Sequence, residues 1–234
     1  MTDVWSEGQL AEFDAFANTY QNLVTDSVRL SGESSEYFAA YKAAYVARVL
    51  PSKRIEKVLD YGCGVGSLAK HLKNQLPATR IDGFDLSTES LQRVDQTLRK
   101  QGVYSSCPND LKADYDLIVL SNVLHHVRPE GRQAVFSEIF ARLRDGGSLI
   151  VFEHNPYNPL TRWAVSQCPF DGDAVLLRNG ETLRRFQLAD FRILRSDFIV
   201  FFPRWLAPLR SLEPHLNWIP CGAQYAVVGI KGTA

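Results

Sequence analysis

The sequence has no excess of charge of either sign. Its 234 residues include 26 Lys and Arg and 26 Asp and Glu, so the formal net charge is zero. Proteins that bind nucleic acid usually show a basic excess or a basic stripe, and only short clusters such as RIEK and LRRF occur here. We therefore expect no nucleic-acid partner.

Paired cysteines and long apolar runs are also missing. The four cysteines, Cys63, Cys107, Cys168 and Cys221, are far apart and form no CxxC pair, so we expect free thiols in a reducing cytoplasm. No apolar run reaches the roughly 18 residues that a membrane-spanning helix needs, and the first residues do not read as a signal peptide. The sequence thus predicts a cytoplasmic protein without a membrane span.

The composition that remains, 45% hydrophobic and 22% charged, suits one globular domain with a full core over residues 1–234. There is no internal repeat. We divide the chain into a helical N-terminal lid (1–50), a core (51–153) and a C-terminal cap with a strand pair (154–234). Helical spacing of apolar residues defines two helices, at 9–30 and 34–50. Their apolar positions are Leu10, Phe13, Phe16, Ala17 and Tyr20, then Tyr37, Phe38, Tyr41, Ala44 and Tyr45.

From residue 57 onward, strands and helices alternate. Strands are expected at 57–62, 80–87, 103–106, 115–121 and 148–153, with helices at 67–76, 89–100 and 131–144. The segment YDLIVLS (115–121) is apolar on both faces, as buried parallel strands are. Two further β-type runs, 191–202 and 224–232, could pair antiparallel at a sheet edge. This pattern predicts a Rossmann-like α/β fold with helices on both faces of the sheet.

The stretch VLDYGCGVGSLAKHL (58–72) contains a glycine-rich loop that is open to two interpretations. Starting at Gly64, GVGSLA fits a dinucleotide-binding pattern, with Asp85 about where a ribose-binding acid is expected. Starting at Asp60, a carboxylate precedes the glycines at the end of a strand. Beside a pyrophosphate it would be unfavourable by roughly 1 kcal/mol or more. A ligand with an α-amino group, a sulfonium and a ribose suits both acids, and that ligand is S-adenosylmethionine.

The segments VLDYGCGVG, FDLS, YDLIVLSNVLHHV and LRDGGSLIVFE together resemble the ordered motifs of class I S-adenosylmethionine-dependent methyltransferases, over roughly residues 55–155. The resemblance implies a seven-stranded, mostly parallel sheet with an antiparallel C-terminal strand. It also implies cofactor-binding roles near the methionine part, the ribose and the methyl group. The residues concerned are Asp60, Gly62, Cys63, Gly64, Gly66, Asp85, Leu86, Ser121 and Asn122.

Two parts of the cofactor site are less defined. The acid on the adenine side usually follows the third strand of this family, where Cys107, Asn109 and Asp110 are the candidates here. An N-terminal helix often closes over the cofactor, and Tyr20 could stabilise the sulfonium through cation–π attraction. The alternative is that Tyr20, with Phe13 and Phe16, simply packs against the domain.

Three histidines are the candidates for catalysis. His125 and His126 follow the expected fourth strand and His154 follows the fifth, at the sheet edge where doubly wound folds bind ligands. An oxygen acceptor with a high pKa needs a general base, which His154 would supply. The alternative is that each histidine only makes hydrogen bonds within the protein and has no catalytic role.

The acceptor side is expected to include Tyr37, Asn155 and Trp205. In a resembling subgroup, the ubiquinone-pathway O-methyltransferases, the positions matching Asn122, His125 and His126 are thought to bind a divalent metal. Both acids of that motif are missing here, and a hard metal such as magnesium prefers oxygen ligands. The sequence therefore predicts no metal.

The sequence indicates methyl transfer from S-adenosylmethionine to a small molecule. We expect the methylated atom to be oxygen in preference to nitrogen. The segment 198–220 is rich in aromatic residues and proline and would wall an apolar acceptor cavity. The alternatives are an NAD-type oxidoreductase that uses GVGSLA, and an S-adenosylmethionine-binding protein that does not methylate.

Overall fold

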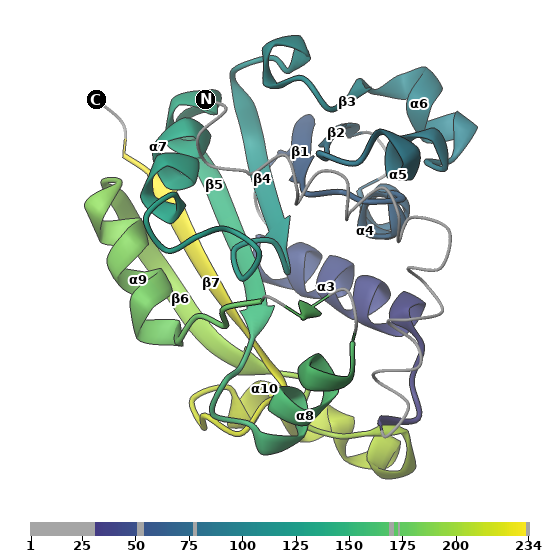
Figure 1. Cartoon of the computed structure of the whole chain (residues 1–234), viewed down its shortest axis with the longest axis vertical. Coiled ribbons are helices and arrows are strands. Elements are labelled where there is room, and N and C mark those ends of the chain that lie inside the picture. The colour runs from purple at the N-terminus through teal and green to yellow at the C-terminus, as the bar shows by residue number, and fades with distance from the viewer. Residues whose placement is uncertain (1–30, 51–53, 77–78, 169–170, 173, 233–234) are drawn as a thin grey trace.

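The computed structural model describes residues 31–50, 54–76, 79–168, 171–172 and 174–232. The helix expected at 9–30, with Tyr20, therefore lies outside the described residues. Within them the chain forms a central sheet flanked by helices (Figure 1). The strands are β1 (Lys57–Tyr61), β2 (Arg80–Phe84), β3 (Tyr104–Ser105), β4 (Tyr115–Ser121), β5 (Leu143–His154), β6 (Phe191–Ile199) and β7 (Gln224–Lys231).

The described strands form a seven-stranded sheet in the order β3-β2-β1-β4-β5-β7-β6. The pairs from β3 to β5 are parallel, whereas β7 runs antiparallel to both β5 and β6. The predicted fold and the predicted antiparallel pairing of the last two strands are confirmed. The strand order reverses between β1 and β4, and doubly wound sheets bind ligands at such a point.

Helices cover both faces of the sheet, as predicted (Figure 1). The helices are α3 (Ser35–Val49), α4 (Ser67–Gln75), α5 (Thr88–Gln92), α6 (Gln96–Gln101), α7 (Arg132–Arg142), α8 (Pro159–Gln167), α9 (Asn179–Leu188) and α10 (Glu213–Leu216). Two short 3-10 segments, η3 (Pro108–Asp110) and η5 (Arg204–Leu212), complete the described elements.

Each face of the sheet has its own apolar layer. Phe136 of α7 and Phe186 of α9 pack with their ring centroids 5.3 Å apart on one face. Val46 of α3 and Leu72 of α4 belong to the layer on the other. Residues 117–120 of β4 are all fully buried between the two layers. Burial of each such side chain stabilises the fold by about 1.5–3 kcal/mol relative to exposure, which explains the unbroken apolar run of this strand.

Three local predictions were wrong. The helix expected at 89–100 is broken, because the side chain of Asp95 accepts a hydrogen bond from Thr97 N and begins a second helix, α6. The strand expected to reach residue 202 ends at Ile199, since Val200 adopts a left-handed φ of 61° that a β-branched residue rarely tolerates. In α3, Ala44 is exposed although it was expected on the apolar face, and Lys42 is buried.

Ser34 is the N-terminal cap of α3, since its hydroxyl accepts a hydrogen bond from Tyr37 N. Across the described ranges, no helix combines the length and the apolar character needed to cross a bilayer.

Candidate active site

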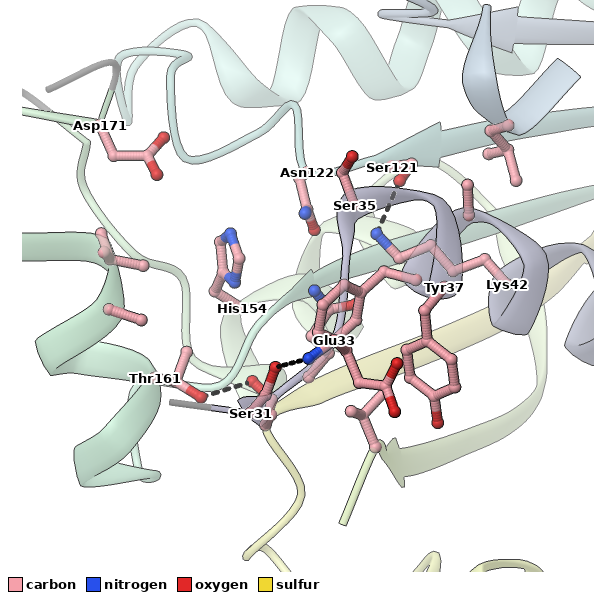
Figure 2. Close-up of a pocket in the computed structure, with 18 of the residues that line it drawn as sticks. Ser31, Glu33, Ser35, Tyr37, Lys42, Ser121, Asn122, His154, Thr161 and Asp171 are labelled. Atoms are coloured by element: carbon pink, nitrogen blue, oxygen red, sulfur yellow. Dashed lines mark hydrogen bonds between the residues drawn. The ribbon is translucent and has the colours of Figure 1, made fainter. Parts of the chain in front are cut away.

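The carboxyl ends of β1, β4 and β5 open into one cavity of about 340 Å³ (Figure 2). Helix α3 lines it on one side, and α8 and the start of η5 line it on another. The cavity lies at the point where the strand order reverses between β1 and β4. This single space brings together residues that lie more than 100 positions apart in the sequence.

The glycine loop after β1 approaches the cavity closely. Gly62 has a φ of 80°, and a Cβ at this position would lie 2.3 Å from Cγ2 of Val123, so no other residue fits without movement. Gly64 also has a positive φ, 52°, but a Cβ there would meet no atom within 4 Å. Both glycines line the cavity, and Gly64 leaves its backbone accessible to a ligand. Gly66 is the N-terminal cap of α4.

Asp60 is the most unusual group of this loop. Its side chain is 1% exposed, and neither carboxylate oxygen makes a well-formed hydrogen bond within the described chain. Burial, and then the negative charge of Asp85, raise the pKa of Asp60 to about 7, although the Ala69 amide and the Lys42 ammonium act against this rise. A buried carboxylate is costly unless a cation or a donor binds it. Asp60 therefore fits the ammonium group expected of the cofactor.

A second buried oxygen without a partner lies at the end of β4. Asn122 adopts a left-handed φ of 58°, and its backbone N–H donates to Phe152 O at 2.9 Å. Its side-chain Oδ1 has no hydrogen-bond partner among the described residues. Next to it, Ser121 Oγ accepts a hydrogen bond of 2.8 Å from Lys42 Nζ (Figure 2). Both Ser121 and Asn122 line the cavity, where the sequence placed them.

Lys42 is a cavity residue that the sequence analysis missed. Its side chain is 4% exposed, and burial lowers its pKa to about 8 despite the nearby charges of Glu153 and Asp60. An ammonium group at this place suits a carboxylate, so Lys42 and Asp60 together present complementary charges to an amino-acid moiety. A lysine within the otherwise apolar stretch 38–47 was the only signal in the sequence.

The remaining cofactor candidates have different surroundings. The Asp85 carboxylate accepts from Gly64 N at 2.7 Å and from Ser87 N at 2.9 Å, which fixes it beside the glycine loop but outside the cavity lining. Cys63 lines the cavity, whereas Leu86 packs against the apolar core. Their roles in cofactor binding stay predictions.

The adenine-side candidates stay open as well. Cys107, Asn109 and Asp110 are all exposed on and around η3. Asp110 accepts a hydrogen bond from Ser105 Oγ, which also accepts one from Cys107 N. None of the three lines the cavity.

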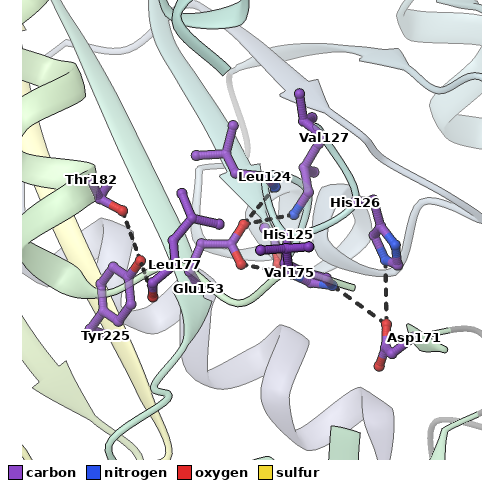
Figure 3. Close-up of polar contacts among 12 residues, drawn as sticks. Leu124, His125, His126, Val127, Glu153, Asp171, Val175, Leu177, Thr182 and Tyr225 are labelled. Carbon is purple, nitrogen blue, oxygen red and sulfur yellow. Dashed lines mark hydrogen bonds and ion pairs between the residues drawn. The ribbon is translucent and has the colours of Figure 1, made fainter. Parts of the chain in front are cut away.

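His125 and His126 meet Glu153 and Asp171 at another wall of the cavity (Figure 3). His125 Nδ1 lies 2.7 Å from Glu153 Oε2, and Glu153 Oε1 accepts from the amides of the two residues before His125. Asp171 Oδ1 lies 3.5 Å from His125 Nε2 and 3.3 Å from His126 Nε2. His154 also lines the cavity, with its ring centroid 5.1 Å from that of His125. The three sequence-predicted histidines are thus brought together.

The three histidines of this group differ in the direction of their pKa shifts. Burial lowers the pKa of His125, but the charge of Glu153 and the hydrogen bonds with Asp171 and Glu153 outweigh it and raise the pKa to about 9. Burial and the positive charge of His125 lower the pKa of His154 to about 4 and also lower that of His126. At neutral pH the neutral rings are therefore His126 and His154.

Two of the three acceptor-side candidates line the cavity. Tyr37 and Trp205 line the cavity, and Trp205 is 74% exposed at its rim. Asn155 does not line it. Its Nδ2 donates to Pro220 O and Gly222 O, and its Oδ1 accepts from Tyr157 N, so it fixes the chain before β7. Its expected contact with the acceptor stays a prediction, although both polar atoms of its side chain already make hydrogen bonds within the protein.

Part of the C-terminal segment forms a wall of the cavity, although Val200 also belongs to the apolar layer of the sheet. Residues 200–203 and Trp205 line the cavity, and η5 contains no buried residue. Trp218 is also 74% exposed, but it lies outside the cavity lining and donates its indole N–H to His215 O.

A model of the methyltransferase domain family matches residues 35–201, which include most of the residues that line the cavity. The chain belongs to the class I S-adenosylmethionine-dependent methyltransferases. The cofactor of this family is S-adenosylmethionine, as the sequence motifs indicated.

Individual relatives are distant. A sterol 24-C-methyltransferase from Aspergillus fumigatus is 24% identical over 88% of this chain and 62% of its own length. A carboxy-S-adenosyl-L-methionine synthase from Chromohalobacter salexigens is 33% identical over 41% of this chain and 39% of its own. Because the chain spans less than two thirds of either relative, a shared activity does not follow from these matches.

The solved structures show the fold. A methyltransferase from Archaeoglobus fulgidus superposes with a TM-score of 0.64 at 17% identity, over 82% of this chain and 94% of that chain. The magnesium protoporphyrin IX methyltransferase of Synechocystis superposes with a TM-score of 0.63 at 15% identity, over 97% and 99%.

Besides Lys42, this methyltransferase-family chain has two site residues that sequence reasoning missed. Glu153 is the last acid before His154 in an otherwise apolar strand, and that contrast could have marked it. Asp171 follows α8 in the stretch CPFDGDAV, where no periodicity or motif distinguishes it. Only the folded chain places it against the histidines.

Proposed function

We propose that the protein transfers the methyl group of S-adenosylmethionine to an oxygen atom of a small, partly apolar acceptor. The observation that carries this proposal is the shared cavity. Asp60, a buried carboxylate with no well-formed hydrogen bond to the described residues, lies on one wall, and a histidine group lies on another. A cofactor held by the first wall would direct its reactive end toward the second.

The charge of Asp60 favours methyl transfer over hydride transfer. A pyrophosphate beside a buried carboxylate would be repelled, whereas the amino group of S-adenosylmethionine would be attracted. Lys42 would bind the carboxylate of the same methionine moiety. Asp85, held at the glycine loop, would bind the ribose. Bound there, the cofactor supplies a sulfonium methyl group for in-line displacement, a reaction in which positioning and exclusion of water provide much of the rate.

The acceptor is proposed to have an aromatic or aliphatic body. The rim of the cavity carries exposed apolar side chains, with Leu160 66%, Trp163 46% and Trp205 74% exposed. Phe201 and Phe202 line the interior beside them. A relative that acts on sterols agrees with such an acceptor. A nucleic acid or a highly charged sugar phosphate would find few cationic partners on this wall.

An oxygen target is proposed because a base is available. His154 lines the cavity, and its lowered pKa keeps the ring neutral at physiological pH, so it can accept a proton from a hydroxyl group. His126 is a second neutral ring on the same wall, and His125 is held by Glu153 and Asp171. All four cysteines are free thiols, in keeping with the cytoplasm as the proposed location.

Calorimetry with S-adenosylmethionine, its demethylated product and NAD tests the cofactor. We expect binding of the first two and none of NAD, and the opposite pattern would overturn the proposal. Mass spectrometry with a panel of hydroxylated aromatic and aliphatic acceptors then tests the reaction. The match to a carboxy-S-adenosyl-L-methionine synthase favours a second candidate, a reaction that consumes the cofactor without methylating an acceptor. A cofactor product without a methylated acceptor would identify that case.

A further inference from the structure

Three side chains from separate segments converge at the histidine wall of the cavity. His125 follows β4, His154 ends β5, and Asp171 lies in the loop after α8 (Figures 2 and 3). One ligand atom from each of the three lies within 4.8 Å of the other two. We infer that His125, His154 and Asp171 form a binding site for a divalent transition-metal ion. Two imidazoles and one carboxylate on one side of an open position are a common ligand set for such ions.

The distances suit this occupant. His125 Nε2 lies 3.5 Å from Asp171 Oδ1. Two ligands bound at about 2.0–2.2 Å from one ion, at tetrahedral or octahedral angles, lie roughly 3–3.6 Å apart. The rings of His125 and His154 are tilted by 52° with centroids 5.1 Å apart, so they are not stacked and their nitrogens can face a common point. These side chains need little movement to reach an ion.

A buried carboxylate orients the first of these ligands. Glu153 is fully buried, and its Oε2 lies 2.7 Å from His125 Nδ1. Because Glu153 accepts this hydrogen bond, Nδ1 carries the proton and Nε2 faces Asp171. A carboxylate that holds one imidazole nitrogen while the other binds the ion recurs at metal sites in proteins.

The loop that carries Asp171 is tied to the loop that carries His125. Val175 N donates to His125 O at 2.8 Å, and the buried Arg132 donates from Nη2 to Val175 O at 2.6 Å. The Nε of Arg132 also donates to Leu124 O and Val127 O, on either side of His125. These hydrogen bonds hold Val175 beside His125 without an ion, and Asp171 N donates to Cys168 O at 3.0 Å on the other side of the loop.

The ligand set selects among metals. Imidazole nitrogen suits zinc, iron, cobalt and nickel, whereas magnesium and calcium prefer oxygen ligands. The site also differs from the trio suggested by the ubiquinone-pathway resemblance, with which it shares only His125. His154 and Asp171 both face the cavity, so the open position points to the proposed acceptor. In that reaction, a role that rests on the proposed function, the ion would lower the pKa of an acceptor hydroxyl, and His154 would act as a ligand of the ion instead of as the general base.

The competing occupant is a proton. In that case a protonated His125 bridges Glu153 and Asp171, and no ion is needed. The two cases differ in a measurement that requires neither cofactor nor acceptor. Protein treated with a chelator and then dialysed is titrated with Zn²⁺ and Co²⁺ by calorimetry, and the Co²⁺ form is examined by visible absorption spectroscopy.

We expect one ion per chain and visible Co²⁺ absorption bands typical of nitrogen and oxygen ligands. His154→Ala and Asp171→Asn should each weaken binding by more than about 100-fold, and Glu153→Gln by about 10- to 100-fold. His215→Ala, in α10 and away from the cavity, is the matched control and should bind like the unchanged protein.

Binding of neither ion by the unchanged protein, or undiminished binding by both ligand variants, would overturn the inference. The spectrum of the unchanged protein decides the question even if a variant fails to fold. Calorimetry of S-adenosylmethionine on the same chelator-treated protein is a separate result. A failed metal site therefore remains distinguishable from a failed proposed function.

Discussion

Replacement of Asp60 by asparagine should have opposite effects on the protein alone and on its complex with the cofactor. The carboxylate is 1% exposed and has no well-formed hydrogen bond among the described residues. Asparagine has nearly the same shape but cannot ionise, so the change removes the charge and little else. We expect Asp60→Asn to stabilise the protein alone at pH 8 and to weaken cofactor binding.

The stability effect follows from the direction of the pKa shift. The pKa of Asp60 is raised from 3.8 to about 7 in the folded protein. Between these values the folded state binds more protons than the unfolded state, so stability falls as the pH rises through this window. The full cost, present above pH 7, is on the order of 4 kcal/mol. The attraction between Asp60 and Lys42 is already contained in this shift, so the expected gain in the asparagine variant is about 4 kcal/mol.

Thermal unfolding measures this gain. For a chain of this length about 4 kcal/mol corresponds to roughly 8–16 °C in Tm at pH 8, and the difference should vanish near pH 4. The exposed Asp114, on the turn before β4, provides the control variant Asp114→Asn. That variant should show no such pH-dependent gain.

Cofactor binding should change in the other direction. Loss of a buried, charge-assisted hydrogen bond to the ammonium group costs about 2–3 kcal/mol, which corresponds to roughly 30- to 150-fold in Kd for S-adenosylmethionine. Calorimetry at pH 8 measures it. A variant that is less stable than the unchanged protein and binds the cofactor equally well would refute the placement of the ligand against Asp60.

Three further expectations concern the other walls of the cavity. Asp85→Ala should weaken S-adenosylmethionine binding by about 2–3 kcal/mol in calorimetry, through loss of the ribose contact; unchanged affinity would contradict that contact. His154→Ala should lower kcat by about 10²-fold or more with nearly unchanged cofactor affinity, while equal small losses in His154→Ala and His126→Ala would indicate catalysis by proximity alone. Trp205→Ala should raise KM for apolar acceptors, whereas Trp218→Ala, outside the cavity lining, should leave KM unchanged; a preference for charged acceptors that neither change disturbs would overturn the proposed acceptor class.

The sequence by itself determined the sheet and the cofactor loop. Apolar runs such as 115–121 must be buried on both faces. A strand of this kind occurs mainly at the centre of a parallel sheet. The order of carboxylate and glycines from Asp60 to Gly66 requires a tight turn between strand and helix. These features depend on residues that are close together in the chain, so local chemistry was enough to read them.

Local periodicity was less reliable where two alternatives had similar energies. In α3 it marked Ala44 as a core residue, yet the helix buries Lys42 instead. The ammonium group is tolerated there because Ser121 and the acids of the cavity surround it. A single helix offers no means of seeing these partners, which come from β1, β4 and β5.

The tertiary structure alone decided the histidine wall. Glu153 and Asp171 are site residues because they contact His125, from which they are separated by 28 and 46 residues in the sequence. These contacts depend on the hydrogen bonds by which Arg132 holds two loops together. It also decided that Asn155, next to His154 in the sequence, faces away from the cavity and fixes the chain before β7. Neighbours in sequence alternate sides at a strand end, so adjacency could not show which of the two reaches the cavity.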